Sequence, residues 1–121
     1  YANRRAECAA AARLLGVGSL RDVDPAGVEA AAASLPATEL ARARHVVGEI
    51  ARVPAFVGAL AVGDWEMAGR LLGESHRSLS VDYAVSCPEL DRIVELSRGI
   101  SGIVGPQVTT SHPRCTKARR K

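Results

Sequence analysis

Apolar residues recur at intervals of three and four along most of the chain, a pattern that predicts amphipathic helices. The pattern is clearest over residues 44–91, where we expect two long helices, an extended connector at 80–85 and a third helix. The first long helix carries one apolar stripe: Leu40, Ala43, Val46, Val47, Ile50, Val53, Val57, Leu60 and Ala61. Pro54 lies within this stripe. Because proline lacks a backbone donor and clashes with the carbonyl four residues earlier, we expect a kink or two abutting helices there.

The boundaries of the next two helices are marked by turn and capping residues. Gly63 is expected to end the first long helix and Asp64 to cap the second, which gives a tight antiparallel turn. The second helix should bury Trp65, Ala68, Leu71, Leu72, Ser75 and Leu79. Residues 86–89 match a capping box and open a third helix that ends near Gly99. Its buried residues are expected to be Leu90, Ile93 and Val94, with Leu96 as a further candidate.

The chain before and after this region is simpler. We expect a helix over 1–15, a short helix from Pro25, capped by Asp24, to about Leu35, and a cap at Thr38 for the long helix. Residues 100–109 hold at most one short strand, because glycine and proline interrupt their β-branched residues. Residues 109–121 show no apolar period and are expected to form a disordered basic tail. The expected fold class is therefore mainly α.

Composition fits one domain of ordinary size. The chain has 121 residues, 47% of them apolar, and only four aromatic side chains. It has no apolar run of about 18 residues, so we expect no transmembrane helix. It opens with charged residues and without a methionine, which favours a fragment of a longer chain with no signal peptide. Its three widely spaced cysteines are typical of reduced thiols in a cytoplasmic protein.

The net charge of +3 is concentrated at the C-terminus, where five of the last eight residues are Lys or Arg. The remaining body is slightly acidic, with eleven basic residues against thirteen acidic ones. The charge therefore describes the tail, and it does not indicate a nucleic-acid-binding body. The tail also lacks aromatic residues that could stack on a base.

Several sequence segments carry a family resemblance. RHVVGEI, GDW, ESHRSL, DY and VSCPELD occur in this order at tight spacing over residues 44–91. Together they resemble the C-terminal half of galactokinase, a sugar kinase of the GHMP superfamily. The first residues, YANRRAEC, are similar to the family's Tyr-x-x-Arg-Arg segment. The resemblance implies that residues 1–108 are the helical part of the α+β C-terminal domain of a GHMP-type kinase.

The resemblance also implies an activity for the intact family enzyme, which transfers the γ-phosphate of MgATP to the anomeric hydroxyl of α-D-galactose. The family's phosphate loop and its catalytic Asp and Arg lie upstream of the first residue of this chain, and no glycine-rich phosphate cradle occurs within it. We therefore expect this fragment to be inactive and to bind no MgATP, although the resemblance itself is to an enzyme. Localisation in the cytoplasm is expected.

The family's third signature is a glycine-rich segment after the last helix, and here it is altered. The matching region reads GPQVTTSHPRC, in which Gly105 and Thr109 stay in register. Proline and β-branched residues cannot form a loop that needs unusual backbone angles. We expect a broken or aberrant terminus.

One functional position carries over from the resemblance. Tyr1 falls where the family places a tyrosine that contacts bound galactose, so we assign it as substrate-binding. In the isolated chain, where the rest of the pocket is absent, the alternative is that Tyr1 does nothing. No catalytic, cofactor-binding or metal-binding residue is assigned.

Other candidate residues have simpler explanations. His76 lies at the edge of the apolar face and is expected to be a satisfied structural histidine, and His45 is given no role. Cys87 at a helix start could be reactive, but a buried or capping thiol is the favoured interpretation. A metal site is not expected, because only His112 and Cys115 have the close spacing of zinc ligands.

Two other function classes remain open. The first is a non-catalytic helical binding module or sugar sensor derived from the kinase, and the second is a protein whose basic tail binds nucleic acid. The expected partner of the intact enzyme is galactose; neither nucleic acid nor membrane is expected to bind. Helices that lack their covering domain should expose an apolar surface, so self-association is also expected.

Overall fold

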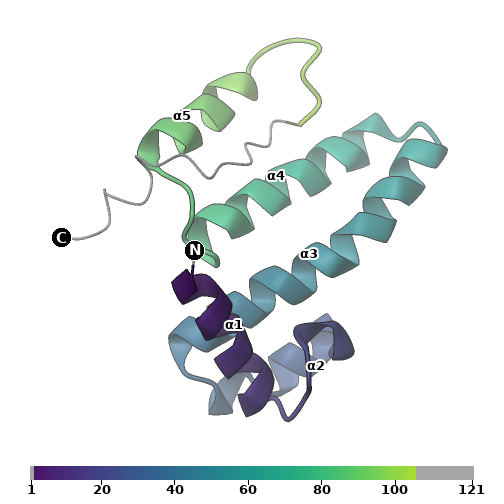
Figure 1. Cartoon of the computed structure of the whole chain (residues 1–121). Helices are drawn as coiled ribbons and strands as arrows, with labels where there is room; N and C mark the ends of the chain where they lie inside the picture. The colour runs from purple at the N-terminus through teal and green to yellow at the C-terminus, as the bar shows by residue number, and fades with distance from the viewer. Residues whose placement is uncertain (1, 106–121) are drawn as a thin grey trace. The chain divides into compact units, whose positions relative to one another are not determined.

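The computed structural model describes residues 2–105, and in this range the chain is helical (Figure 1). The elements are α1 (Ala2–Leu14), the 3-10 turn η1 (Leu20–Asp22), α2 (Pro25–Ala30), the 3-10 turn η2 (Ala32–Ser34), α3 (Ala37–Ala61), α4 (Trp65–Val81) and α5 (Pro88–Ser97). No strand occurs over 2–105, which confirms the mainly α class. Residues 100–105, part of the segment predicted to hold at most one short strand, contain no strand, and the rest of that segment, like the basic tail, lies outside the described residues.

The chain divides into two compact units at the bond between Pro54 and Ala55. This bond lies inside α3, which continues through Pro54 without a break. The expectation of two abutting helices is therefore wrong, while the expected kink stays a prediction. Since proline has no N–H, α3 lacks the hydrogen bond that a backbone N–H at position 54 would donate to the carbonyl of Ile50.

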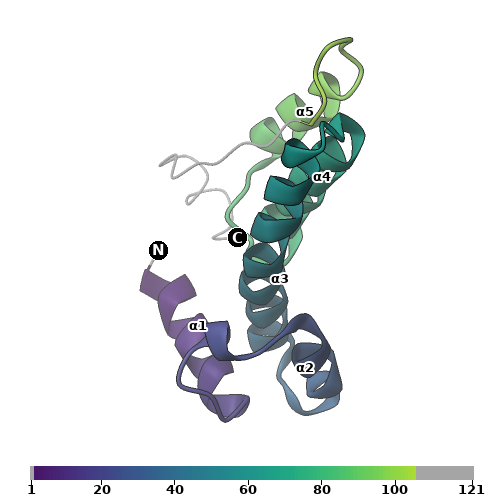
Figure 2. The same ribbon diagram turned by 90° about the vertical axis from the view of Figure 1, so that its right-hand side faces the viewer.

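The first unit has a core of small and aliphatic side chains. Its fully buried members come from α1, η1, α2 and the first turns of α3: Ala11, Ala12, Leu20, Val28, Ala43 and Val47. Figure 2 shows α1, α2 and the first turns of α3 close together. Alanine on α1 and α3 leaves little side chain between the helices, which permits a close approach.

Local capping sets the short elements of this unit. The Asp24 carboxylate accepts a hydrogen bond from the Gly27 N–H at 2.7 Å, as expected for the start of α2. The helix then ends at Ala30, earlier than predicted, and the chain continues as the 3-10 turn η2. Thr38 does not cap α3, because the helix already includes Ala37 and its first carbonyl acceptor is that of Pro36.

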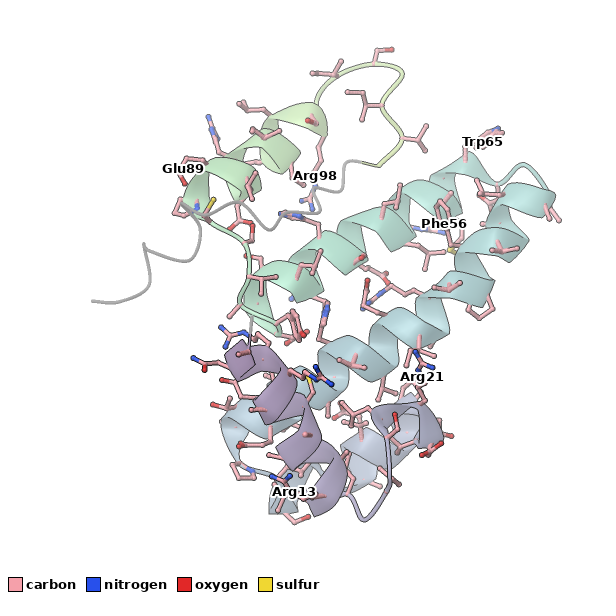
Figure 3. The ribbon with its side chains drawn as sticks, in the orientation of Figure 1. Arg13, Arg21, Phe56, Trp65, Glu89 and Arg98 are labelled. Carbon is pink, nitrogen blue, oxygen red and sulfur yellow. The ribbon has the colours of Figure 1, made fainter. Side chains whose placement is uncertain are left out.

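The second unit begins with the end of α3 and its turn into α4. Gly63 has a left-handed backbone with φ of 70°, and the Asp64 carboxylate accepts a hydrogen bond from the Met67 N–H at 3.0 Å. Both predictions for this turn are confirmed. Phe56 lies between the end of α3 and α4 (Figure 3).

The buried face of α4 confirms the prediction for Ala68 and Ser75 and differs from it elsewhere. It consists of small and polar residues: Ala68, Gly69, Ser75, His76 and Ser78. Trp65, predicted to be buried, is 59% exposed at the first turn (Figure 3). At Gly69, a Cβ atom would sit 1.8 Å from the carbonyl oxygen of Val104. The chain at 104–105 therefore packs directly on the α4 backbone, and a large side chain is excluded from this contact.

The connector and α5 also depart from the predictions. Helix α4 reaches Val81, and the connector then turns at Ala84, whose φ is 55°, so it is not extended over 80–85. The N-cap of α5 is Cys87, one residue after the predicted Ser86. Val94 is buried, but Ile93 and Leu96 are more than half exposed, so only a narrow face of α5 is buried.

Candidate functional site

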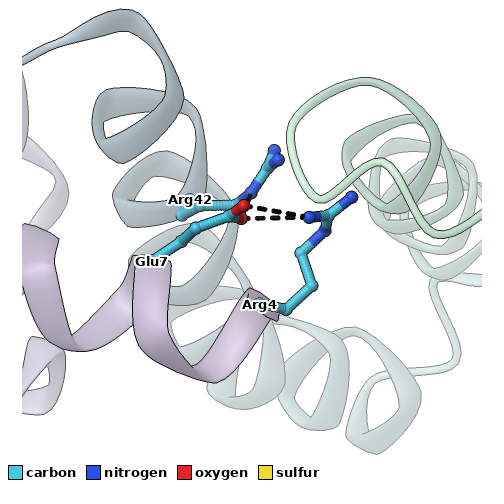
Figure 4. Close-up of polar contacts among 3 residues, drawn as sticks. All are labelled: Arg4, Glu7 and Arg42. Carbon is cyan, nitrogen blue, oxygen red and sulfur yellow. Dashed lines mark hydrogen bonds and ion pairs between the residues drawn. The ribbon is translucent and has the colours of Figure 1, made fainter. Parts of the chain in front are cut away.

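The segment beside the predicted sugar contact is held by a cluster of three charged residues. Tyr1 itself lies outside the described residues, and α1 begins at the next residue, Ala2. From the first turns of α1, Arg4 and Glu7 face Arg42 of α3 (Figure 4). All three belong to the first compact unit.

The carboxylate of Glu7 accepts hydrogen bonds from both arginines. Nη1 of Arg4 lies 3.2 Å and 3.1 Å from the two Glu7 oxygens. Nε of Arg42 donates to Oε2 of Glu7 at 2.6 Å (Figure 4). Arg42 is only 8% exposed, so its charge is largely removed from water. A buried guanidinium of this kind needs a carboxylate partner, and Glu7 supplies it.

The same contacts set the ionisation of Glu7. Partial burial raises the pKa of Glu7, but the hydrogen bonds and positive charges of Arg42 and Arg4 outweigh it, so the pKa lies below its usual value of 4.5. Glu7 is therefore a stable anion at neutral pH and is not poised for proton transfer. The cluster anchors the start of α1 on α3.

Sequence reasoning missed this cluster. Arg4 and Glu7 are three residues apart on a predicted helix, which is a detectable signal for an ion pair. Arg42 is 35 residues from Glu7, and the apolar stripe of its helix places it only on another, polar side. Its burial depends on the approach of α1, which the sequence pattern does not specify.

A second polar cluster connects α4 to α5 around Asp91. Oδ1 of Asp91 lies 3.0 Å from Nε2 of His76 and accepts a hydrogen bond from the Ser86 hydroxyl at 2.6 Å. Its Oδ2 accepts one from the Ser80 hydroxyl at 3.0 Å. The cluster spans residues of the ESHRSL and VSCPELD segments. The family resemblance of these segments therefore coincides with a structural connection between two helices.

The charge state of this cluster follows from its hydrogen bonds. Desolvation raises the pKa of Asp91, but the donors Ser86, Ser80 and His76 together keep it below its usual value of 3.8. Because a carboxylate can only accept, Nε2 of His76 carries the proton in this bond.

His76 is a structural histidine, as predicted, but it is buried and does not lie at the edge of the helix face. It is 4% exposed, and its Nδ1 has no hydrogen-bond partner among the described residues. The prediction of a fully satisfied side chain is therefore wrong at Nδ1. The hydroxyls of Ser80 and Ser86 both donate to Asp91, so neither serine is arranged as a nucleophile activated by His76.

The remaining candidates are placed in the helical framework. His45 is buried on α3, and Cys87 is a buried N-cap residue whose side chain makes no capping bond. Within residues 2–105 no three His, Cys, Asp or Glu side chains group as metal ligands. His112 and Cys115 lie outside the described residues.

Comparison with known proteins finds relatives of this chain. The chain is 48% identical over 109 residues to galactokinase from Homo sapiens, and 46% identical to galactokinase from Bos taurus and from Canis lupus familiaris. The resemblance to galactokinase is confirmed.

The matches cover most of this chain but only part of each relative. Each galactokinase match includes 90% of the chain but only 28% of the relative's length. The similarity is therefore to a C-terminal-type segment of galactokinase. No family model matches the chain. None of its described helices is long and apolar enough to cross a membrane.

Proposed function

We propose that this chain is part of a cytoplasmic galactokinase, whose intact form phosphorylates α-D-galactose at the anomeric hydroxyl with MgATP. The observation that carries the proposal is the 48% identity to human galactokinase across 90% of the chain. In this proposal residues 1–108 are the helical part of the GHMP-type C-terminal domain, and residues 109–121 are a basic tail.

The role of this part is to support the sugar site from one side. Tyr1, which directly precedes α1 in the sequence, contacts galactose. The bonds of Arg4 and Arg42 to Glu7 support this role, because they tie the first turns of α1 to the long helix α3. A sugar contact needs such a fixed support, since small displacements weaken oriented hydrogen bonds.

The chain alone is expected to lack phosphoryl transfer. Such transfer depends on positioning the phosphates and neutralising their charge with a loop and magnesium, and the sequence contains no glycine-rich phosphate cradle. In an assay with MgATP and galactose, the isolated chain should give no galactose-dependent release of ADP. Turnover by this chain alone would contradict the proposal.

A binding measurement separates this proposal from a sugar sensor. Galactose added to the isolated, isotope-labelled chain should leave its NMR spectrum unchanged, because one tyrosine contact cannot retain a sugar. Saturable galactose-dependent shifts around α1 would favour the sensor. Glucose at the same concentration is the control for nonspecific sugar effects.

A further inference from the structure

The second compact unit contains an open groove beside α4 that the proposed function does not use. Its volume is about 710 Å³. Gly69 and Gly73 of α4 lie along it, and Arg77 of α4 and Arg98 at the end of α5 line it as well. All of these residues lie in the same compact unit.

Missing side chains on α4 create the space. A Cβ atom at Gly73 would lie 3.8 Å from an Nη2 atom of Arg98, so the guanidinium reaches over this glycine. Figure 3 shows Arg98 directed from the end of α5 toward α4. A larger residue at position 73 would project into the space beside Arg98.

The groove holds two guanidinium groups that pair with no carboxylate of residues 2–105. Nη1 of Arg70 lies 3.7 Å from Oε1 of Glu66, and Glu74 is not free either. By contrast, the guanidinium groups of Arg77 and Arg98 have no hydrogen-bond or ion-pair partner within residues 2–105. Two positive groups from different elements therefore line one groove.

We propose that this groove binds a phosphate group between Arg77 and Arg98. A carboxylate is planar and is satisfied by one arginine fork. A phosphate presents oxygens in several directions and carries up to two negative charges, so it can accept from two guanidinium groups at once. Glu66 and Glu74 at the groove limit its positive charge, which favours a small phosphate group over an extended polyanion.

The test is an NMR titration of the full chain at constant ionic strength. Inorganic phosphate should cause saturable shifts of the Gly73 amide and of the Arg77 and Arg98 side-chain signals. Phenyl phosphate is the second probe and acetate the third. Tighter binding of phenyl phosphate would identify a phosphate monoester as the ligand, and equal binding would identify free phosphate. Equal binding of acetate would overturn the proposal.

Substitutions decide whether the groove itself binds. The double variant Arg77→Gln/Arg98→Gln should weaken phosphate binding at least about tenfold, because it removes hydrogen bonds between charged groups. Gly73→Leu should have a similar effect by filling the space without changing charge. The matched control is Arg92→Gln, an exposed arginine of α5 that is paired with Glu95 outside the groove. Circular dichroism verifies that each variant is folded.

Three results would contradict the phosphate site. They are the absence of saturable shifts at Arg77 and Arg98, unchanged affinity in the double variant, and an equal loss of affinity in Arg92→Gln. None of these readouts depends on kinase activity or on galactose. Failure of the phosphate site and failure of the proposed function are thus separate outcomes.

Discussion

At the scale of single residues, two carboxylates connect separate elements. Glu7 joins α1 to Arg42 of α3, and Asp91 joins α5 to His76 of α4. Each accepts several hydrogen bonds, and each has a lowered pKa. These residues are therefore expected to stabilise the fold as anions.

The first prediction compares two Glu–Arg pairs with similar N–O distances and different burial. Glu7 pairs with the buried Arg42 at 2.6 Å, whereas Glu29 pairs with the exposed Arg44 at 2.7 Å. Glu7→Gln should lower the free energy of unfolding by about 1–3 kcal/mol, because it leaves the buried guanidinium of Arg42 without its carboxylate partner. Glu29→Gln, the matched control, should cost clearly less because solvent screens its pair. Urea denaturation measures both, and equal losses would disprove a special role for Arg42.

The second prediction concerns pH. Because the folded pKa values of Glu7 and Asp91 lie below 4.5 and 3.8, the unfolded chain binds more protons in this range. Their stabilisation is fully present above these usual values and is lost as the pH falls through the lowered folded values. The free energy of unfolding should therefore decrease as the solution is acidified below pH 4.5.

Asp91→Asn provides the control for that pH dependence. Its side chain is 42% exposed, so the substitution should cost only roughly 1 kcal/mol at pH 7. The difference from the unsubstituted chain should shrink at low pH, where Asp91 is protonated in both states. A difference that stays constant from pH 7 to the acid limit would show that the carboxylate charge is irrelevant.

At the scale of elements, the helices and the caps at Asp24 and Asp64 were predictable, but the caps at Thr38 and Ser86 and most of the buried faces were not. Gly63 and Asp64 act within one turn, so their roles are visible in the sequence. Ser86 looked like a cap from its spacing, but its hydroxyl donates to Asp91 on the next helix. Trp65 and Ile93 fit apolar periods and are exposed, because burial depends on which neighbour reaches that face.

The features of the candidate site were likewise predictable from the sequence only in part. The family segments followed from resemblance, and the assignment of Tyr1 from the same source stays a prediction. The partnership of Glu7 with Arg42 and the groove beside Gly73 required the fold. Contacts between residues far apart in sequence leave no periodic signal in a single chain.

The third prediction uses two helix glycines in different surroundings. A Cβ at Gly69 would collide with the Val104 carbonyl, while one at Gly58 would meet nothing within 4 Å. Gly58→Ala should stabilise the chain by about 0.5–1 kcal/mol through the higher helix propensity of alanine.

Gly69→Ala should destabilise the chain despite the same gain in propensity, because the segment at 104–105 must move away from α4. Thermal unfolding of the two variants in parallel gives the comparison. Stabilisation by Gly69→Ala would show that the contact with Val104 contributes nothing.

At the scale of the whole molecule, the chain exposes many large apolar side chains. On the final turns of α3, Val57 is 59% and Leu60 41% exposed, and Val62 after the helix is 79% exposed. The chain spans 28% of the length of its galactokinase relatives, so much of a complete enzyme of that kind lies outside the matched segment. Exposed apolar surface of this kind marks interaction sites.

The fourth prediction is therefore self-association of the isolated chain. Sedimentation velocity should show species larger than a monomer as the concentration rises, and Val57→Lys/Leu60→Lys should reduce them. Lysine at two exposed positions of the same helix should leave its helical content unchanged in circular dichroism. A chain that stays monomeric at all concentrations would contradict this prediction.

Pro54 has a consequence for how the molecule opens. The compact units meet at this residue, and its missing N–H weakens the helix that both units share. The free energy of cooperative opening is higher where contacts are dense. Each unit should therefore exchange its amide hydrogens with solvent deuterium at a rate of its own. Mass spectrometry of peptides from either side of Pro54 should then reveal two free energies of opening within one continuous helix.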